Sequence, residues 1–155
     1  MANVKPIPDG YPRVSVYLSV DGAAAAIAFY RDVFKAEERF RMAGPDGKIG
    51  HAELQIGDSV VMLADEFPEM GAPSPKTIGG TPVTMMVYVE DVDETVALAV
   101  HAGATETRAV QDQFYGDRSG QFEDPFGHRW NVASHIEDVP PEEMEKRAAQ
   151  AMSAD

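Results

Sequence analysis

Apolar residues recur along this chain with two periods, which mark strands and helices in a repeating order. Residues 13–20, RVSVYLSV, alternate apolar with polar side chains, as a strand with one buried face does. Residues 22–36 instead place Ile27, Tyr30 and Phe34 at helical spacing. The same two periods predict a second helix at residues 92–102 and further strands at 37–42, 48–56, 59–64, 82–90, 105–110, 118–123 and 128–134. The order strand-helix-strand-strand-strand is therefore predicted twice.

The two halves also resemble each other in sequence. The apolar strand that starts at Val16 has a counterpart that starts at Met85, and each is followed by an acidic residue and a predicted helix. The same offset along the chain separates Val61 from Trp130. Because two separated segments share one offset, we interpret the chain as an internal duplication of a βαβββ module. The predicted fold class is α+β, with two mixed half-barrel sheets.

The segments outside the two modules are rich in turn-forming residues. Pro68, Pro73 and Pro75 predict an irregular linker between the modules. The predicted organisation is an N-terminal arm at 1–12, a first module at 13–65, a linker at 66–81, a second module at 82–135 and a C-terminal helical tail at 136–155.

Short polar side chains are expected to define the helix ends. Asp21 is predicted to cap the first helix and Asp91 or Asp93 the second, because a carboxylate oxygen can accept hydrogen bonds from the first helical turn. Gly103 is expected to follow the second helix in a left-handed conformation. Asp138 is the predicted cap of the tail helix.

Composition narrows the classes of function. The chain has 155 residues, of which 44% are hydrophobic, and it contains no cysteine, so disulfides and thiolate chemistry are excluded. A formal net charge of −13 argues against binding to nucleic acid or to anionic membranes, because both need basic side chains to neutralise phosphate. Neither a secretory signal nor a membrane-spanning segment is expected. The predicted location is cytoplasmic.

Several segments carry a family resemblance. They are Val20-Asp21 followed by IAFYRDVF at 27–34, VYVEDVD at 87–93, and DPFGHRW at 124–130. Together they resemble the vicinal oxygen chelate superfamily, which includes glyoxalase I, extradiol dioxygenases, fosfomycin-inactivating enzymes and bleomycin-binding resistance proteins. HAEL at 51–54 and EEM at 142–144 resemble its PhnB-like, glyoxalase-like branch. The resemblance implies that one face of each sheet packs on its helix and the other lines a small-molecule cleft.

Strand alternation assigns side chains to these two faces. The helix-facing set includes Val14, Val16, Leu18, Val20, Leu54, Val61, Leu63, Val83, Met85, Val87, Trp130 and Val132. The resemblance implies that metal-dependent members carry His, Gln or Glu ligands on the first, fourth, fifth and eighth strands. The matching residues here are Ser15, Met62, Thr84 and Asn131. A divalent cation needs anionic or imidazole ligands, so no metal and no cofactor are expected.

Other side chains remain available for chemistry on the cleft face. His51 and Glu53 are the candidate catalytic residues, either as a general acid/base pair or as part of a new metal site. The preferred interpretation of the two side chains is a structural hydrogen-bonded pair. The predicted ligand-binding residues are Tyr17, Met62, Thr84, Met86, Tyr88, Tyr115, Arg129 and Asn131. They would form an amphipathic pocket or simply fill the half-barrel. The loop from Tyr115 to Arg118 is interpreted as fixing the start of the seventh strand, and His101, His128 and His135 as ordinary histidines.

These features support a protein that binds a small organic molecule without a metal. The alternative is a lyase or isomerase of the glyoxalase-like type, using His51 and Glu53 or an unrecognised divalent metal. A third interpretation is a protein–protein interaction module with a vestigial cleft. A homodimer is expected, because the appended C-terminal helix and the family resemblance both suggest buried association surface.

Overall fold

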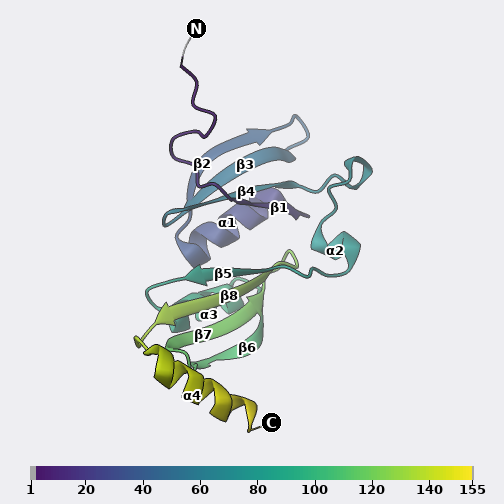
Figure 1. The fold of residues 1–155 in the computed structure, drawn as a ribbon. Coiled ribbons are helices and arrows are strands. Elements are labelled where there is room, and N and C mark those ends of the chain that lie inside the picture. The colour runs from purple at the N-terminus through teal and green to yellow at the C-terminus, as the bar shows by residue number, and fades with distance from the viewer. Residues whose placement is uncertain (1–2, 155) are drawn as a thin grey trace. The chain divides into compact units, whose positions relative to one another are not determined.

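The computed structural model describes residues 3–154 and divides into two compact units, one ending at Gly80 and the other starting at Thr81 (Figure 1). Among the described residues no helix is long and apolar enough to cross a membrane. Each unit contains one four-stranded mixed sheet, so the predicted α+β fold with two repeated βαβββ modules is confirmed.

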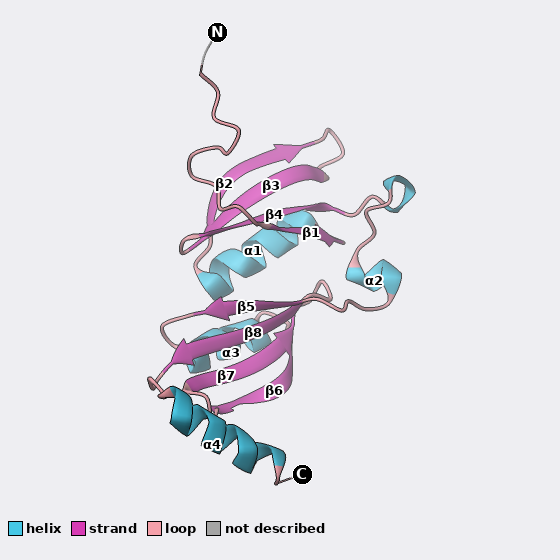
Figure 2. Ribbon diagram, in the orientation of Figure 1, coloured by secondary structure: helices cyan, strands magenta, loops and turns pink. Residues whose placement is uncertain are grey.

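The first unit is built around the sheet order β1-β4-β3-β2. Strand β1 pairs parallel with β4, and the other neighbours pair antiparallel. Helix α1 contacts all four strands and covers one face of the sheet (Figure 2). The elements are β1 (Val16–Val20), α1 (Ala23–Phe34), β2 (Glu37–Ala43), β3 (Ile49–Ile56), β4 (Ser59–Asp65), a 3-10 helix η1 (Pro68–Met70) and α2 (Pro75–Ile78).

The second unit repeats this topology with the sheet order β5-β8-β7-β6. Strand β5 is parallel to β8, and helix α3 lies on one face of the sheet (Figure 2). The elements are β5 (Thr84–Tyr88), α3 (Val92–His101), β6 (Thr105–Asp112), β7 (Asp117–Glu123), β8 (Arg129–His135) and α4 (Pro141–Met152). Arg147 ties α4 to this unit through the carboxylate of Glu137, at 2.8 and 2.9 Å, and the carbonyl of Phe114, at 3.2 Å.

The core of each unit lies between its sheet and its helix. In the first unit Ile27 and Tyr30 of α1 are fully buried with Leu18, Leu54 and Leu63 of the sheet. The corresponding core residues of the second unit are Val92, Val96 and Ala99 of α3, with Phe122, Trp130 and Val132 of the sheet. The predicted strand parity is therefore confirmed at Leu18, Leu54, Leu63, Trp130 and Val132. The opposite sheet face remains for polar and aromatic side chains.

Two predicted core residues are exposed. Val14 is 86% exposed and Val83 is 54% exposed. Both precede the first paired residue of their strand, since β1 begins at Val16 and β5 at Thr84. The alternation was extended beyond the point where the chain joins the sheet, so the helix-facing assignment is wrong for these two residues.

The segment between the modules is more ordered than an irregular linker. It contains η1 and α2, and Phe67 forms a β-bridge with Ala72. The carboxylate of Glu66 accepts hydrogen bonds from the amide of Ser74, at 2.7 Å, and the hydroxyl of Thr77, at 2.7 Å. These bonds lower the pKa of Glu66, with the Ser74 amide as the largest cause. The proline and glycine content of the segment concealed this local structure.

The cap of α1 comes from a strand rather than from the preceding residue. Gly22 is the N-cap and makes no side-chain cap, so the Asp21 prediction is wrong. Instead Asp65, the last residue of β4, accepts from the amides of Gly22 and Ala23 through Oδ1, at 3.1 and 2.9 Å. Its Oδ2 accepts from the amide of Ile49 at 2.7 Å. One carboxylate therefore joins helix α1 to β3 and β4.

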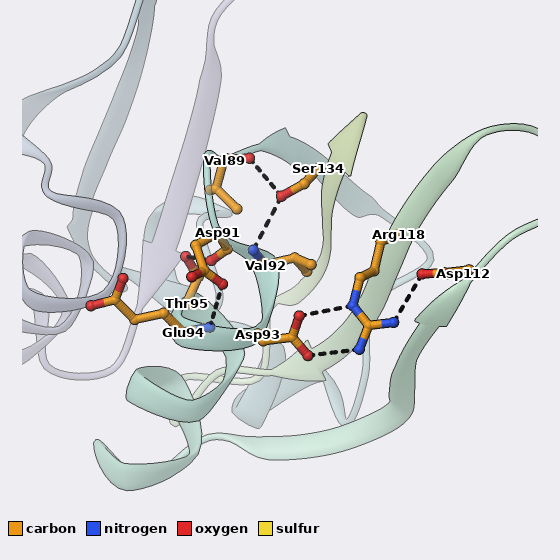
Figure 3. Close-up of polar contacts among 9 residues, drawn as sticks. All are labelled: Val89, Asp91, Val92, Asp93, Glu94, Thr95, Asp112, Arg118 and Ser134. Atoms are coloured by element: carbon orange, nitrogen blue, oxygen red, sulfur yellow. Dashed lines mark hydrogen bonds and ion pairs between the residues drawn. The ribbon is translucent and has the colours of Figure 1, made fainter. Parts of the chain in front are cut away.

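In the second unit, the residue that corresponds to Asp65 makes different hydrogen bonds (Figure 3). Ser134 occupies the position that corresponds to Asp65 in the repeat. It accepts from the amide of Val92 at 3.1 Å and donates to the carbonyl of Val89 at 2.8 Å. Asp91 caps α3 by accepting from the amide of Glu94 at 3.0 Å, which confirms that alternative. Gly103 follows α3 with φ of 105°, as predicted.

The other two predicted caps have different partners. Asp93 forms an ion pair with Arg118, whose guanidinium also reaches Asp112 at 2.9 Å (Figure 3). That ion pair lowers the pKa of Asp93. Asp138 does not cap α4, because Pro140 occupies the N-cap position.

Changing Asp65 to alanine is expected to lower the free energy of unfolding by about 2 kcal/mol, because three backbone amides lose their acceptor. Urea denaturation followed by circular dichroism measures this change. Asp21→Ala is the matched control and should cost less than about 0.5 kcal/mol, since Asp21 is exposed and is not the N-cap. Equal losses in the two variants would contradict the assignment of the cap to Asp65.

Candidate functional site

The sheet face opposite α1 brings together the candidate residues of the first unit. Tyr17 of β1 and Glu53 of β3 both lie opposite Met62 of β4 in the strand register, and His51 is two residues before Glu53. Tyr17 Oη lies 2.8 Å from His51 Nδ1, and His51 Nε2 lies 3.2 Å from Glu53 Oε1. A phenol, an imidazole and a carboxylate thus form one hydrogen-bonded row across the sheet.

Glu53 is held in place by a residue of the N-terminal arm. The Glu53 residue is only 8% exposed, and Tyr11 donates its hydroxyl hydrogen to Oε2 at 2.7 Å. This bond is the largest cause of the lowered pKa of Glu53, followed by the opposing effect of burial and then by the hydrogen bond from His51. Glu53 is therefore a carboxylate at neutral pH, with both of its oxygens occupied.

An arginine fixes Tyr11 in turn. The Arg39 guanidinium lies over the Tyr11 ring, 4.6 Å from its centroid, and donates to the carbonyl of Gly10 at 3.1 Å. Sequence reasoning identified neither Tyr11 nor Arg39. Tyr11 lies in the predicted arm, whereas Arg39 lies in a strand beyond the first helix, so no local pattern connects them.

Aromatic and thioether groups surround this polar row. The ring of His51 lies 5.5 Å from that of Tyr17 and 6.2 Å from that of Phe40, between centroids. Tyr17, Phe40 and Met42 are 51%, 48% and 55% exposed, respectively. The face therefore offers a polarizable, partly apolar surface next to the hydrogen-bonded row.

The sheet face opposite α3 carries most of the remaining predicted ligand-binding residues. Thr84 of β5 lies beside Arg129 of β8, and Met86 lies beside Asn131. Tyr88 shares the face by alternation along β5 and is 61% exposed. The second unit thus brings these five residues onto one surface.

Asn131 is the unusual member of this face. Its Oδ1 is buried and has no hydrogen-bond partner among residues 3–154. An unpaired buried carbonyl oxygen costs about 1–3 kcal/mol, so this atom is a destabilising feature of the free protein. Gln113, in the loop before β7, carries the other such atom within the described residues, its Nε2.

Tyr88 belongs to a second cluster of hydrogen-bonded side chains, which sequence reasoning did not identify. Its hydroxyl donates to Asp117 Oδ2 at 2.8 Å, and Asp117 Oδ1 lies 2.8 Å from His135 Nδ1. The other ring nitrogen of His135 lies 2.8 Å from Asp138 Oδ1. Tyr115, at 36% exposure, packs edge-on against Phe114 at 5.3 Å in the loop before β7.

The charges of this group shift two pKa values. The hydrogen bond to Asp117 is the largest cause of the raised pKa of Tyr88, and Tyr115 makes a smaller contribution. The pKa of His135 is raised by its hydrogen bonds to Asp117 and then to Asp138. Since an ionised carboxylate only accepts hydrogen bonds, this geometry favours a cationic ring with a proton on both nitrogens. The structure thus gives His135 a specific ion-pairing role that the sequence did not predict.

Stability should consequently fall as His135 loses its proton. Because its pKa is raised in the folded state, the contribution is fully present below about pH 6.5 and is lost as pH rises through the raised value. Urea midpoints at about pH 6 and about pH 9 are expected to differ less in His135→Gln than in the unchanged protein. His101→Gln, on the exposed side of α3, should keep the original difference. An unchanged pH dependence in His135→Gln would contradict the ion-pair assignment.

The donor groups at the four positions that the family resemblance matches to metal ligands do not fit a divalent cation. Ser15 and Met62 occupy them in the first unit, and Thr84 and Asn131 in the second, so none provides a carboxylate or an imidazole. Across residues 3–154 no three His, Asp or Glu side chains converge as a metal site, which leaves His51 and Glu53 without a third ligand of these types.

In the first unit, a pocket of about 360 Å³ lies beside the start of α1. Its acidic lining includes Asp65 and Glu66, whose carboxylates already bind the backbone amides described for the helix start and the following loop. The remaining lining residues are Asp21, Lys48, Phe67, Pro68 and Glu69. We assign this pocket a structural role, because two of its carboxylates stabilise the backbone around it.

Comparisons with known proteins cover both modules. Residues 13–132 match the family model described as the Glyoxalase/Bleomycin resistance protein/Dioxygenase superfamily. The uncharacterized protein Mb0911c of Mycobacterium bovis is 46% identical over 137 residues, which are 86% of this chain and 90% of that protein. The crystal structure of TioX from Micromonospora sp. ML1 superposes with a TM-score of 0.61 and 28% identity, covering 81% of this chain and 99% of that one. A PhnB protein from Bacillus cereus shares the fold, with a TM-score of 0.59, 16% identity and coverage of 79% and 99%.

Proposed function

The chain belongs to the glyoxalase/bleomycin resistance protein/dioxygenase superfamily, as its sequence resemblance predicted, and on that premise we propose that it binds a small organic molecule without a metal ion. The observation that carries this proposal is the unpaired buried Oδ1 of Asn131 on the open sheet face of the second unit. A ligand N–H or O–H group would supply the missing hydrogen bond and remove its cost.

The neighbouring side chains suit the rest of such a ligand. Met86 and Tyr88 are 47% and 61% exposed, so a bound planar molecule would cover apolar surface that now faces water. Arg129 lies beside Thr84 in the register and provides a cation for a carboxylate or carbonyl group of the ligand. The combination favours a partly aromatic molecule with at least one hydrogen-bond donor.

Binding is proposed to need no metal because the available side chains are poor ligands for a divalent cation. Serine, methionine, threonine and asparagine occupy the four positions that the resemblance matches to metal ligands, and none is an ionic ligand. Binding is therefore proposed to depend on hydrogen bonds and apolar contact, and to persist in the presence of a chelator. A cytoplasmic location and a homodimer remain predictions from the sequence, and sedimentation of the purified chain would test the latter.

The second candidate function is a lyase or isomerase reaction on the face of the first unit. The hydrogen bond of 3.2 Å between His51 and Glu53 favours it, since a carboxylate that orients an imidazole is a common arrangement for general acid/base catalysis. Glu53 is ionised and buried, which suits the orienting role. A metal is not required for this chemistry.

A fragment screen with a matched pair of variants tests the binding proposal. We expect fragments that carry an aromatic ring and an amide or hydroxyl donor to raise the melting temperature, by the equivalent of about 3 kcal/mol at a hundredfold excess over Kd. Asn131→Leu should abolish this stabilisation while leaving the free protein folded, because it removes an unpaired amide oxygen. Gln113→Leu removes an unpaired amide nitrogen outside the strand face and should retain binding. No binding by any fragment, or equal binding by both variants, would contradict the proposal.

A further inference from the structure

We propose that Tyr17 exchanges a proton with the bound molecule, while His51 receives the phenolic proton and Glu53 stabilises the resulting imidazolium. This inference deepens the second candidate function, and it rests on the proposed function in that an organic molecule must bind at a sheet face. In this proposal Tyr17, rather than His51, contacts the substrate directly.

The carboxylate end of the row is fixed before any ligand arrives. Tyr11 donates to Oε2 of Glu53 at 2.7 Å, and His51 Nε2 lies 3.2 Å from Oε1. Glu53 is 8% exposed, so little water competes for these oxygens. Glu53 and Tyr11 are therefore positioning residues that set the orientation of the imidazole.

The tautomer of His51 follows from these partners. A carboxylate has no hydrogen to donate, so the hydrogen bond to Glu53 requires a proton on Nε2. In the neutral ring Nδ1 then carries a lone pair, and Tyr17 donates its hydroxyl hydrogen to it across 2.8 Å. The ring nitrogen that acts as a base thus points at the phenol rather than at the open face.

Tyr17 is the member of the row with the most open side chain. It is 51% exposed, whereas the His51 and Glu53 side chains are 24% and 11% exposed. Burial and the Glu53 charge raise the pKa of Tyr17, so the phenol keeps its proton at neutral pH. It becomes a base only as its proton moves to His51, which couples the two transfers.

The row supports proton abstraction from an organic molecule. The Tyr17 oxygen takes a proton from carbon while its own proton moves to Nδ1 of His51, and the carbon–hydrogen electron pair passes into the substrate. The return of the proton from His51 to Tyr17, and from Tyr17 to product or water, restores the starting state. The substrate class is a planar molecule with an acidic C–H bond, and Phe40 and Met42 offer apolar contact beside it.

The second unit provides a natural comparison. Tyr88 is bonded directly to the Asp117 carboxylate at 2.8 Å, with no imidazole between them. Asp117 is 5% exposed and accepts the Tyr88 hydrogen, but an ionised carboxylate beside a phenol only strengthens retention of its proton. Tyr88 therefore lacks a proton relay, and the matched control for His51→Asn is instead His101→Asn, which removes an exposed imidazole from α3.

Elimination of 5-nitrobenzisoxazole measures base strength without knowledge of the natural substrate. Removal of the ring C–H proton breaks the N–O bond and releases a coloured cyanonitrophenolate. We expect turnover above that of free imidazole at equal concentration, and a fall in kcat of about 100-fold in both Tyr17→Phe and His51→Asn. The double variant should lose no more than either single variant, because the two residues act as one unit. His101→Asn should keep the original rate, because His101 is exposed on α3 and belongs to neither candidate face.

Other outcomes of these assays distinguish a failure of the relay from a failure of the proposed binding function. Loss of turnover in His51→Asn but not in Tyr17→Phe would show that His51 acts directly and would overturn the assignment of Tyr17. Turnover no faster than that of imidazole would overturn the proton relay. If fragments still bind, and only Asn131→Leu loses that binding, the proposed function stands independently of the relay. Glu53→Gln keeps an oxygen acceptor for the His51 N–H and should lower kcat while KM stays constant. A change in KM alone would indicate a structural role.

Discussion

Replacing Asp124 with alanine is expected to lower the free energy of unfolding by about 3–5 kcal/mol. The residue is 3% exposed, and its Oδ1 accepts hydrogen bonds from the amides of Phe126 and His128, each at 2.9 Å. Its Oδ2 accepts from the indole nitrogen of Trp130 at 2.9 Å. Alanine leaves three buried N–H groups without this acceptor, and each such group costs about 1–3 kcal/mol.

Urea denaturation followed by tryptophan fluorescence measures this loss directly, because Trp130 is the single tryptophan of the chain. Asp46→Ala is the matched control, since Asp46 also accepts from a backbone amide in a turn, that of Lys48 at 3.1 Å, but is exposed. It should cost less than about 1 kcal/mol. Similar losses in the two variants would show that burial of the Asp124 bonds adds nothing to stability.

Asp124 also shows how one of the segments that carry the family resemblance encodes local structure. The segment DPFGHRW places an aspartate two, four and six residues before the groups that its carboxylate binds. These three partners are local, so a short motif encodes the three bonds. The periodicity of apolar residues is local in the same way, which explains why the strands, helices and buried sheet faces were predictable.

The structural features that sequence reasoning missed depend on contacts between distant segments. Asp65 caps a helix that starts 42 residues before it, and Tyr11 reaches Glu53 across another 42 residues. His135 pairs with Asp117 across a strand pairing whose register the sequence does not specify. Periodicity gives the face on which a side chain lies but not the partner that it meets there. The face of Tyr17, His51 and Glu53 was therefore predictable, whereas their hydrogen-bonded order was not.

Gly116→Ala is expected to lower the free energy of unfolding by about 3 kcal/mol. Its φ of 99° disfavours any residue with a Cβ, and a Cβ here would clash with the backbone carbonyl of Glu137. The same glycine accepts hydrogen bonds from the amides of Ile136 and Glu137, at 2.9 and 3.0 Å. Since a backbone segment rather than a flexible side chain is in the way, relief requires displacement of the chain after β8.

A second glycine separates the two causes of this loss. Gly47 has a φ of 80° and no neighbouring atom within 4 Å of the place that a Cβ would take, so Gly47→Ala should cost only about 1 kcal/mol for the backbone conformation. The excess cost of Gly116→Ala, read from urea midpoints of both variants, then measures the close approach to Glu137. Equal costs would show that the segment after β8 moves aside freely. An excess would instead show that Gly116 holds the start of β7 against that segment, next to the Asp117 that binds Tyr88 and His135.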